Sequence, residues 1–276
     1  MRPATRQRLK QFAAILGLVL LAGCATTHPG GTPTPVPTPV PQALPWTTAI
    51  GALHNLGNNQ VCTATLVRQN LILTAAHCLA AGEGIPAPRQ FVFVPNEGAT
   101  PVFRGFDVTA IQAVGNQVQQ GLIEGATATD DWALLRIDPA PAELKPVAVN
   151  SFRWAEIEAR LAAGDRFFSG GYGTPGGLRL TQHANCQPVD AAKFGQFLDD
   201  GLVASDCMVR PRDSGGPMVL VDSTGQPHLF AVISGIGQPF SNHPFGIGVI
   251  SGSFINYLNG LNISDNIFWS PLSPAG

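Results

Sequence analysis

Short apolar runs separated by turn residues dominate the chain from Trp46 onward. They are bounded by Gly, Pro and Asn, a pattern typical of all-β barrels or sandwiches rather than alternating strand–helix units. The runs that predict strands are Val61–Val67, Leu71–Thr74, Phe91–Val94, Phe106–Ala113, Trp132–Ile137, Arg166–Gly170, Leu229–Ser234 and Gly246–Ile250. Helical spacing predicts two helices, at Trp154–Leu161 and at Phe254–Leu258. A boundary between two all-β halves falls in Pro139–Ala163.

Composition excludes one large class of function. Charged residues make up 12% of the 276-residue chain, about half of the usual share, and the formal net charge is -2. A chain of this kind has no basic stripe to neutralise phosphates, so we predict no nucleic-acid partner. Hydrophobic residues at 45% are ample for a core.

The N-terminus has the pattern of an export signal. A basic segment, residues 2–10, precedes the apolar run Phe12–Ala22, which is too short to span a membrane as a mature helix. The run ends in Leu21-Ala22-Gly23-Cys24, which resembles the lipobox of bacterial lipoproteins. The resemblance implies a signal peptide at 1–23, cleavage before Cys24, and acylation of Cys24 as a membrane anchor. An ordinary signal peptide with an incidental cysteine is the alternative.

Residues 24–45 are expected to form a spacer between this anchor and a folded domain. From Ala25 to Pro45 the chain has no charge and carries Pro at nearly every second position. Such a stretch adopts extended polyproline II, which at about 3.1 Å per residue spans roughly 60 Å. A Pro-rich ligand for a partner domain is the alternative. Because Ala25 rather than Asp follows the cysteine, the resemblance implies the outer membrane, with the domain outside the cytoplasm.

The remaining cysteines predict an oxidising compartment. Cys62, Cys78, Cys186 and Cys207 are an even set in an exported chain, and four cysteines allow three pairings. A zinc site is the competing interpretation, but no CxxC pair or close His/Cys spacing is present to hold one. We therefore predict no metal site.

Three segments far apart in the sequence carry residue types suited to nucleophilic catalysis. His77 lies in TAAHC at residues 74–78, among small neighbours and beside a cysteine, which predicts a fixed imidazole. Asp131 opens a strongly apolar strand, where a buried carboxylate needs a partner such as an imidazole N–H. Ser214 lies in DSGGP at residues 213–217, a tight turn whose glycines permit close backbone approach. Each segment alone is common in a purely structural role.

Taken together, these segments resemble the chymotrypsin/trypsin-like serine protease family. TAAHC and DSGGP are highly specific, and the spacing from Cys62 to Cys78 also matches. Weaker matches are the DxxLL strand at Asp131, Gly171-Tyr172-Gly173 and Val232-Ile233-Ser234. They extend over about Trp46 to Gly260. The resemblance implies that residues 46–276 form two six-stranded antiparallel β-barrels, at about 46–145 and 164–260, with a short C-terminal helix. It favours disulfides Cys62–Cys78 and Cys186–Cys207.

The resemblance also implies a mechanism. Ser214 would attack a carbonyl while His77 takes its proton and later returns it to the leaving amine. Asp131 would orient the imidazole and stabilise its protonated form, and the family spacing to Leu134-Leu135 prefers it over the adjacent Asp130. An acyl-enzyme at Ser214 would then be hydrolysed by water.

Arg212 is a departure from the family. Relatives usually carry Gly two positions before the serine, and its N–H forms the oxyanion hole together with the N–H of Ser214. A side chain resists positive φ angles, which glycine tolerates. Losing one such donor costs about 10²–10³ in rate. The hole is therefore expected either to be completed on substrate binding or to leave the protein slow or inactive.

The substrate pocket also departs from the family. The segment from Cys207 to Ser214 is longer than usual, so Met208, Val209 and Arg210 compete for the pocket floor. None is acidic, which disfavours cleavage after Arg or Lys and favours an apolar or small side chain. We expect Ser234, Gly235 and Ile236 to line one wall, with Gly246 opposite.

Activation is expected to differ as well. Many relatives are cut at a basic site, and the new amino group pairs with the Asp beside the serine. No Arg or Lys lies between the signal region and Trp46, so we expect no zymogen step and another partner for Asp213, namely Arg210 or Arg212. Solvated loop positions are expected for most of the other histidines, His28, His54, His183, His228 and His243. Of these, His228 and His243 are candidates to line a substrate pocket.

Three functions compete at this point. The leading hypothesis is a serine endopeptidase acting on proteins or peptides at the bacterial cell envelope. The second is a catalytically silent double barrel that serves as an envelope binding module. A serine esterase ranks last, because the Gly-x-Ser-x-Gly elbow is absent. No organic cofactor is expected, and no oligomeric state is assigned.

Overall fold

The computed structural model describes residues 38–39, 44–79, 87–115, 129–173, 178–183, 186–190, 201–237 and 245–261. The signal segment, Cys24, most of the expected spacer, His28 and His243 lie outside these residues.

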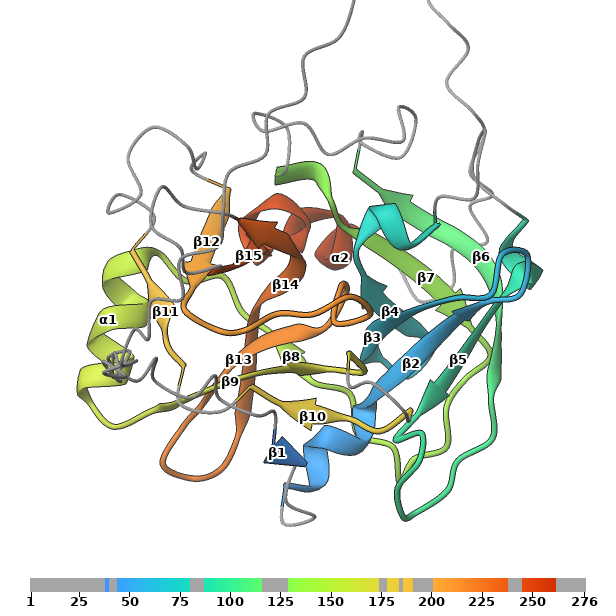
Figure 1. Cartoon of the computed structure of the whole chain (residues 1–276), viewed down its shortest axis with the longest axis horizontal. Coiled ribbons are helices and arrows are strands. Elements are labelled where there is room, and N and C mark those ends of the chain that lie inside the picture. Colours follow the sequence, from blue (N-terminus) through green and yellow to red (C-terminus); the bar gives the residue numbers. More distant parts are fainter. Residues whose placement is uncertain are drawn as a thin grey trace, which may run out of the picture. The chain divides into compact units, whose positions relative to one another are not determined.

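A closed antiparallel barrel forms the first half of the domain (Figure 1). Its strands follow the order β2-β3-β4-β7-β6-β5. Alternation drives burial in β5, where Phe91 and Phe93 are fully buried and Val92 and Val94 are less so. The strand bounds are β2 (Ile50–Asn55), β3 (Gln60–Arg68), β4 (Leu71–Thr74), β5 (Phe91–Pro95), β6 (Phe106–Val114) and β7 (Ala133–Ile137).

A nine-stranded sheet forms the second half. Its order is β1-β10-β9-β13-β14-β15-β12-β11, and β8 pairs with β14 in parallel. Its strands are β1 (Thr38–Pro39), β8 (Ala148–Val149), β9 (Arg166–Gly171), β10 (Thr181–Gln182), β11 (Pro188–Val189), β12 (Leu202–Ser205), β13 (Pro217–Val221), β14 (Pro227–Gly237) and β15 (Phe245–Ile250). Across the described residues this sheet is a half-barrel, because short strands extend its edges instead of closing it as a six-stranded ring.

Both expected helices are present. α1 (Trp154–Ala162) buries Ile157, and the Glu156 carboxylate accepts the Arg153 backbone N–H over 2.6 Å at its start. α2 (Ile255–Gly260) buries Leu258 near the C-terminus. The short 3-10 helices are η1 (Pro45–Ala49), η2 (Ala76–Leu79), η3 (Pro88–Gln90) and η7 (Ser251–Ser253). No helix within the described ranges is long and apolar enough to cross a membrane.

The predicted trypsin-like double barrel is confirmed, and each of the eight predicted strands is found. Three longer strands, β2, β12 and β13, were not predicted. Gly51, His54 and Asn55 interrupt the apolar pattern of β2. Pro217 opens β13 directly after the glycines of DSGGP, so the sequence reads as a turn there. A proline is tolerated as the first residue of a strand.

Two residues within the expected spacer pair with a strand of the folded domain. Thr38 pairs with Gln182 and Pro39 with Thr181, which makes β1 an edge strand beside β10. A proline is compatible with such an edge strand. The spacer at 24–45 as a whole stays a prediction.

The two halves pack against each other through aromatic side chains. Trp46 in η1 meets Phe168 of β9 edge-on, with ring centroids 5.0 Å apart. The buried Tyr172 hydroxyl donates to the Ile50 carbonyl of β2 over 3.3 Å. Burial raises the pKa of the Tyr172 phenol, which keeps the proton that it donates. These contacts fix β9 beside the first barrel, where the candidate site is assembled.

Candidate active site

His77 lies directly after a strand of the first barrel and beside a disulfide. It follows β4 in η2, and its neighbour Cys78 is bonded to Cys62 of β3. The side chain of His77 is 28% exposed, so it is reachable from solvent although its backbone is fixed. This is the held imidazole that the adjacent cysteine predicts.

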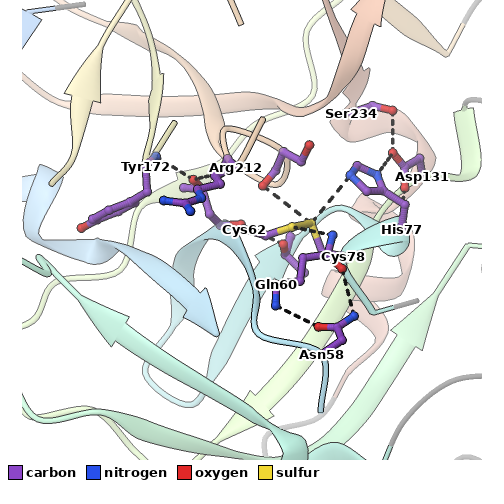
Figure 2. The surroundings of a disulfide bond; sticks show 12 residues. Asn58, Gln60, Cys62, His77, Cys78, Asp131, Tyr172, Arg212 and Ser234 are labelled. Carbon is purple, nitrogen blue, oxygen red and sulfur yellow. Dashed lines mark hydrogen bonds and ion pairs between the residues drawn. A yellow bond between two sulfur atoms is a disulfide. The ribbon is translucent and has the colours of Figure 1, made fainter. Parts of the chain in front are cut away.

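Asp131 forms two hydrogen bonds with His77. Its Oδ2 accepts from His77 Nδ1 over 2.8 Å, and its Oδ1 accepts the His77 backbone N–H over 2.8 Å. Ser234 Oγ donates to the same Oδ2 over 2.5 Å. The carboxylate is fully buried, and these three hydrogen-bond donors compensate for the loss of water around its charge. Figure 2 shows Ser234, Asp131 and His77 as one connected series.

This arrangement selects one tautomer of the imidazole. A proton on Nδ1 is held by the Asp131 carboxylate, which leaves the lone pair on Nε2. Asp131 rather than Asp130 makes this contact, as the family spacing predicts. His77 is thereby set up as a base on its Nε2 side.

The disulfide brings Ser214 to the same place. Cys78 Sγ lies 3.9 Å from His77 Nε2 and 3.7 Å from the Ser214 carbonyl oxygen. The Thr63 backbone N–H donates to that carbonyl over 2.8 Å. Ser214 is in the second half of the domain and the other three residues are in the first. The site therefore forms between the two halves.

Arg212 adopts the backbone conformation that glycine would supply. Its φ is +83°, in the left-handed region that side chains resist. A side chain is expected to oppose this conformation. One hydrogen bond compensates for it, because Thr63 Oγ1 donates to the Arg212 carbonyl over 2.8 Å. Thr63 Oγ1 also accepts the Tyr172 backbone N–H over 3.0 Å. Figure 2 shows Arg212 and Tyr172 on the side of the disulfide away from His77.

Two backbone donors remain uncommitted in this loop. Among the described residues, neither the Arg212 N–H nor the Ser214 N–H is hydrogen-bonded to an acceptor. These are the two groups expected to form the oxyanion hole. Gly215 continues the loop at φ +82°, where an added Cβ would lie 2.1 Å from the Thr63 carbonyl. Glycine is required there because strand β3 passes so close.

The order of these residues, their placement between two β-barrels and the paired imidazole and carboxylate identify a known architecture. The family model described as Trypsin matches residues 37–256. The chain belongs to the trypsin family. No curated protein matches it.

In this trypsin-family chain, Asp213 has a partner that the sequence did not reveal. Its side chain is 1% exposed, and His183 Nε2 lies 2.8 Å from Oδ2. The backbone N–H of Gly173 donates to Oδ1 and that of Arg210 to Oδ2, each over 2.8 Å. The expectation of an arginine guanidinium is therefore corrected, because Arg210 contributes its backbone and Arg212 does not bind Asp213.

The expected pocket residues have different settings. Ser234 is buried and its hydroxyl is committed to Asp131. Gly235 has open space at its Cβ position, and Ile236 is 46% exposed. A Cβ on Gly246 would lie 2.5 Å from Val209 Cγ2, so Val209 fills the space that Gly246 leaves. The Arg210 guanidinium reaches Met208 Sδ at 3.9 Å.

Histidines were the weakest part of the sequence interpretation. His183 is buried, not solvated. His54 pairs with Glu97 over 2.7 Å, and His228 pairs with Asp222 over 3.0 Å and Asn150 over 3.1 Å. Both ring nitrogens of His228 are engaged in these bonds, so neither is left to contact a substrate.

Both disulfides have the pairing that the resemblance favours, Cys62–Cys78 and Cys186–Cys207. Two groups of residues have the types and spacing of metal ligands. One is Cys62, His77 and Cys78, and the other is Cys186, Asp206 and Cys207. A disulfide sulfur offers no thiolate, and thiolate is the form that binds zinc. These two groupings are explained by the disulfides.

Proposed function

We propose that this chain is a serine endopeptidase that cleaves peptide bonds through an acyl-enzyme at Ser214. The observation that carries the proposal is the hold of buried Asp131 on His77 Nδ1 over 2.8 Å, beside the Ser214 loop. A histidine held in this tautomer is suited to take a serine proton at Nε2. Its trypsin-family membership supports the same chemistry.

The reaction follows from the groups in place. Ser214 Oγ attacks the substrate carbonyl carbon while its proton passes to His77 Nε2, and Asp131 stabilises the resulting imidazolium. The carbonyl oxygen becomes an oxyanion that the N–H groups of Arg212 and Ser214 would bind. Collapse of this intermediate breaks the C–N bond, and the leaving amine takes the proton from Nε2. Water, deprotonated by His77, then releases the acid and restores Ser214.

A small or apolar side chain is the proposed preference at the cleaved bond. Val209 packs against Gly246, and a Cβ there would also lie 2.8 Å from Ser205 Oγ, so this wall is apolar or uncharged. Asp206 is exposed, and its Oδ1 accepts the Gln187 N–H over 2.5 Å. The described atoms nearest to Gly246 belong to Val209, Ser205 and Cys207, so none of them is a carboxylate that could pair with a basic substrate side chain.

The test is hydrolysis of a mixed peptide library by the full chain, with cleavage sites identified by mass spectrometry. We expect cuts after small or apolar residues that disappear in Ser214→Ala and in His77→Ala. A folded, disulfide-intact wild type that cleaves nothing would instead support a silent binding module. Cleavage that persists in Ser214→Ala would contradict the proposed nucleophile.

Tethering to the cell envelope is the second part of the proposal. It is supported by the lipobox at Leu21–Cys24 and by the uncharged Pro-rich stretch that follows. Expression in a bacterium with radiolabelled palmitate should label the wild type and place it in the membrane fraction. Cys24→Ser should lose both label and membrane association. Equal fractionation of both proteins would contradict the anchor.

A further inference from the structure

A second buried hydrogen-bonded series lies beneath the serine loop. Ser169 Oγ lies 3.1 Å from His183 Nδ1, and His183 Nε2 lies 2.8 Å from Asp213 Oδ2. The exposed fractions of the His183 and Asp213 side chains are 2% and 1%, and Ser169 is fully buried. Both ring nitrogens of His183 are thus committed, and the mechanism above uses none of these side chains.

The series ends on the loop that carries the reacting groups. Asp213 stands between Arg212 and Ser214, whose N–H groups would bind the oxyanion. The Asp213 carboxylate accepts the Arg210 N–H over 2.8 Å, and the Asp213 N–H donates to the Arg210 carbonyl over 3.0 Å. Its carbonyl accepts the Gly216 N–H over 2.8 Å. Any displacement of this carboxylate would therefore move the backbone on both sides of Ser214.

We propose that His183 and Ser169 are positioning residues that hold Asp213, and through it the oxyanion loop, in the geometry for reaction. In this role His183 takes the place that a newly cut N-terminal amine takes in many relatives, so the chain is competent without a cut at the start of the domain. The inference rests on the proposed peptidase function, because it assigns a role within that same site.

The physical argument is the cost of a buried charge. A carboxylate that is 1% exposed is stabilised only by the donors that surround it. Two of its donors are backbone N–H groups, and His183 supplies the third and the one side chain among the described donors. Ser169 fixes the imidazole from behind, as a second hydrogen bond to a histidine commonly does. Truncating His183 would leave the Asp213 carboxylate without one of its three donors. The loop of residues 208–216 would then be less firmly held.

Space for the carboxylate is also built into the strand beside it. A Cβ on Gly171 would lie 2.6 Å from Asp213 Oδ1, and one on Gly173 would lie 2.5 Å from the same atom. The absence of a side chain at Gly171 and Gly173 therefore leaves room for the carboxylate next to β9, the strand that also carries Ser169. The Asp213 carboxylate is thus bonded by His183, Gly173 and Arg210 and packed closely against Gly171 and Gly173.

Three variants of the full chain test whether His183 holds Asp213 in place. His183→Leu removes both hydrogen bonds, whereas His183→Gln retains an amide N–H that can reach Asp213. His54→Leu is the matched control, because His54 also pairs with a carboxylate, Glu97, and among the described residues neither of these side chains is hydrogen-bonded to residues 208–216. Steady-state peptide hydrolysis and hydrogen exchange of residues 208–216 are measured for each.

For His183→Leu we expect kcat to fall about 100-fold, the size of effect that follows loss of an oxyanion donor, while KM changes little. Exchange across residues 208–216 should accelerate. His183→Gln should recover most of both, and His54→Leu should match the wild type. Should His183→Leu not fold, Ser169→Ala, which removes only the outer bond, is expected to show the same changes more weakly.

Three results would overturn the inference. One is wild-type kcat and exchange in His183→Leu. Another is a His183→Gln variant as impaired as His183→Leu. The last is a wild type that turns over only after a cut that creates a new terminus at the start of the domain. If the wild type has no peptidase activity, the proposed function fails, and loop exchange alone still decides whether His183 holds the loop.

Discussion

The hydroxyl of Thr63 donates to the carbonyl of Arg212 over 2.8 Å. This bond runs from strand β3 of the first barrel to the loop of the second that would stabilise the oxyanion. It compensates for the left-handed φ of +83° at a residue with a full side chain. The departure from the family glycine is thus accommodated by a specific partner in the neighbouring barrel.

Thr63→Val should impair catalysis more than it impairs folding. The variant keeps the shape of the side chain but leaves the Arg212 carbonyl and the Tyr172 N–H without this hydroxyl. A lost buried hydrogen bond costs about 1–3 kcal/mol, so we expect kcat to fall by about 5- to 150-fold in peptide hydrolysis. Thr63→Ser, which retains the hydroxyl, is the control. Equal kcat for Thr63→Val and wild type would rule out this role.

Arg212→Gly should stabilise the protein without loss of activity. Glycine relieves a left-handed conformation that costs a side chain about 1–2 kcal/mol, and the backbone N–H stays in place. Thermal unfolding should therefore give a higher Tm than in the wild type. Arg212→Ala separates conformation from the loss of the guanidinium, since alanine keeps the strain. If glycine and alanine shift Tm alike, backbone strain is not the cause.

Gly173→Ala should be severely destabilising. The added Cβ would lie 2.5 Å from Asp213 Oδ1, and the Gly173 N–H that donates to this carboxylate would have to move. We expect a loss of about 2 kcal/mol or more in the free energy of unfolding, measured by urea titration. Gly260→Ala is the matched control, because an added Cβ there would point into open space. Comparable midpoints for the two variants would contradict the close fit.

Ser234→Ala should lower kcat by removing one of the donors to Asp131. Hydrogen bonds to charged groups are worth about 1.5–3 kcal/mol, so a decrease of about tenfold is expected in kcat/KM. Ser251→Ala serves as the control, because its buried hydroxyl donates to the Asn150 carbonyl instead. A Ser234→Ala enzyme with wild-type kinetics would show that the two remaining donors suffice.

The fold and the close approach of His77, Asp131 and the Ser214 loop were largely predictable from sequence. TAAHC, DSGGP and the apolar strand after Asp131 are local patterns, and each fixes both an element and a side chain. The double barrel followed from the resemblance that these patterns carry, and it is confirmed. Strand β13 was missed because its first residue, Pro217, reads as a turn.

The supporting residues could not be predicted, because each acts across a large sequence separation. Thr63 and Arg212 are 149 positions apart, and Ser234 and Asp131 are 103 apart. His183 follows a two-residue strand and has no motif around it, and its place beside Asp213 depends on the pairing of β10 with β9. One signal was present: no basic cut site precedes the domain, which indicated that Asp213 has a partner other than a new N-terminal amine. The sequence did not indicate which residue that partner is.

The most direct test of the central claim is labelling of the full, disulfide-intact chain with a fluorophosphonate, followed by peptide mapping of the adduct. Ser214→Ala and His77→Ala are run beside the wild type. We predict one adduct on Ser214 Oγ, absent in Ser214→Ala and formed far more slowly in His77→Ala. A folded wild type that takes no label, or that is labelled equally well without His77, would contradict an activated serine at this site.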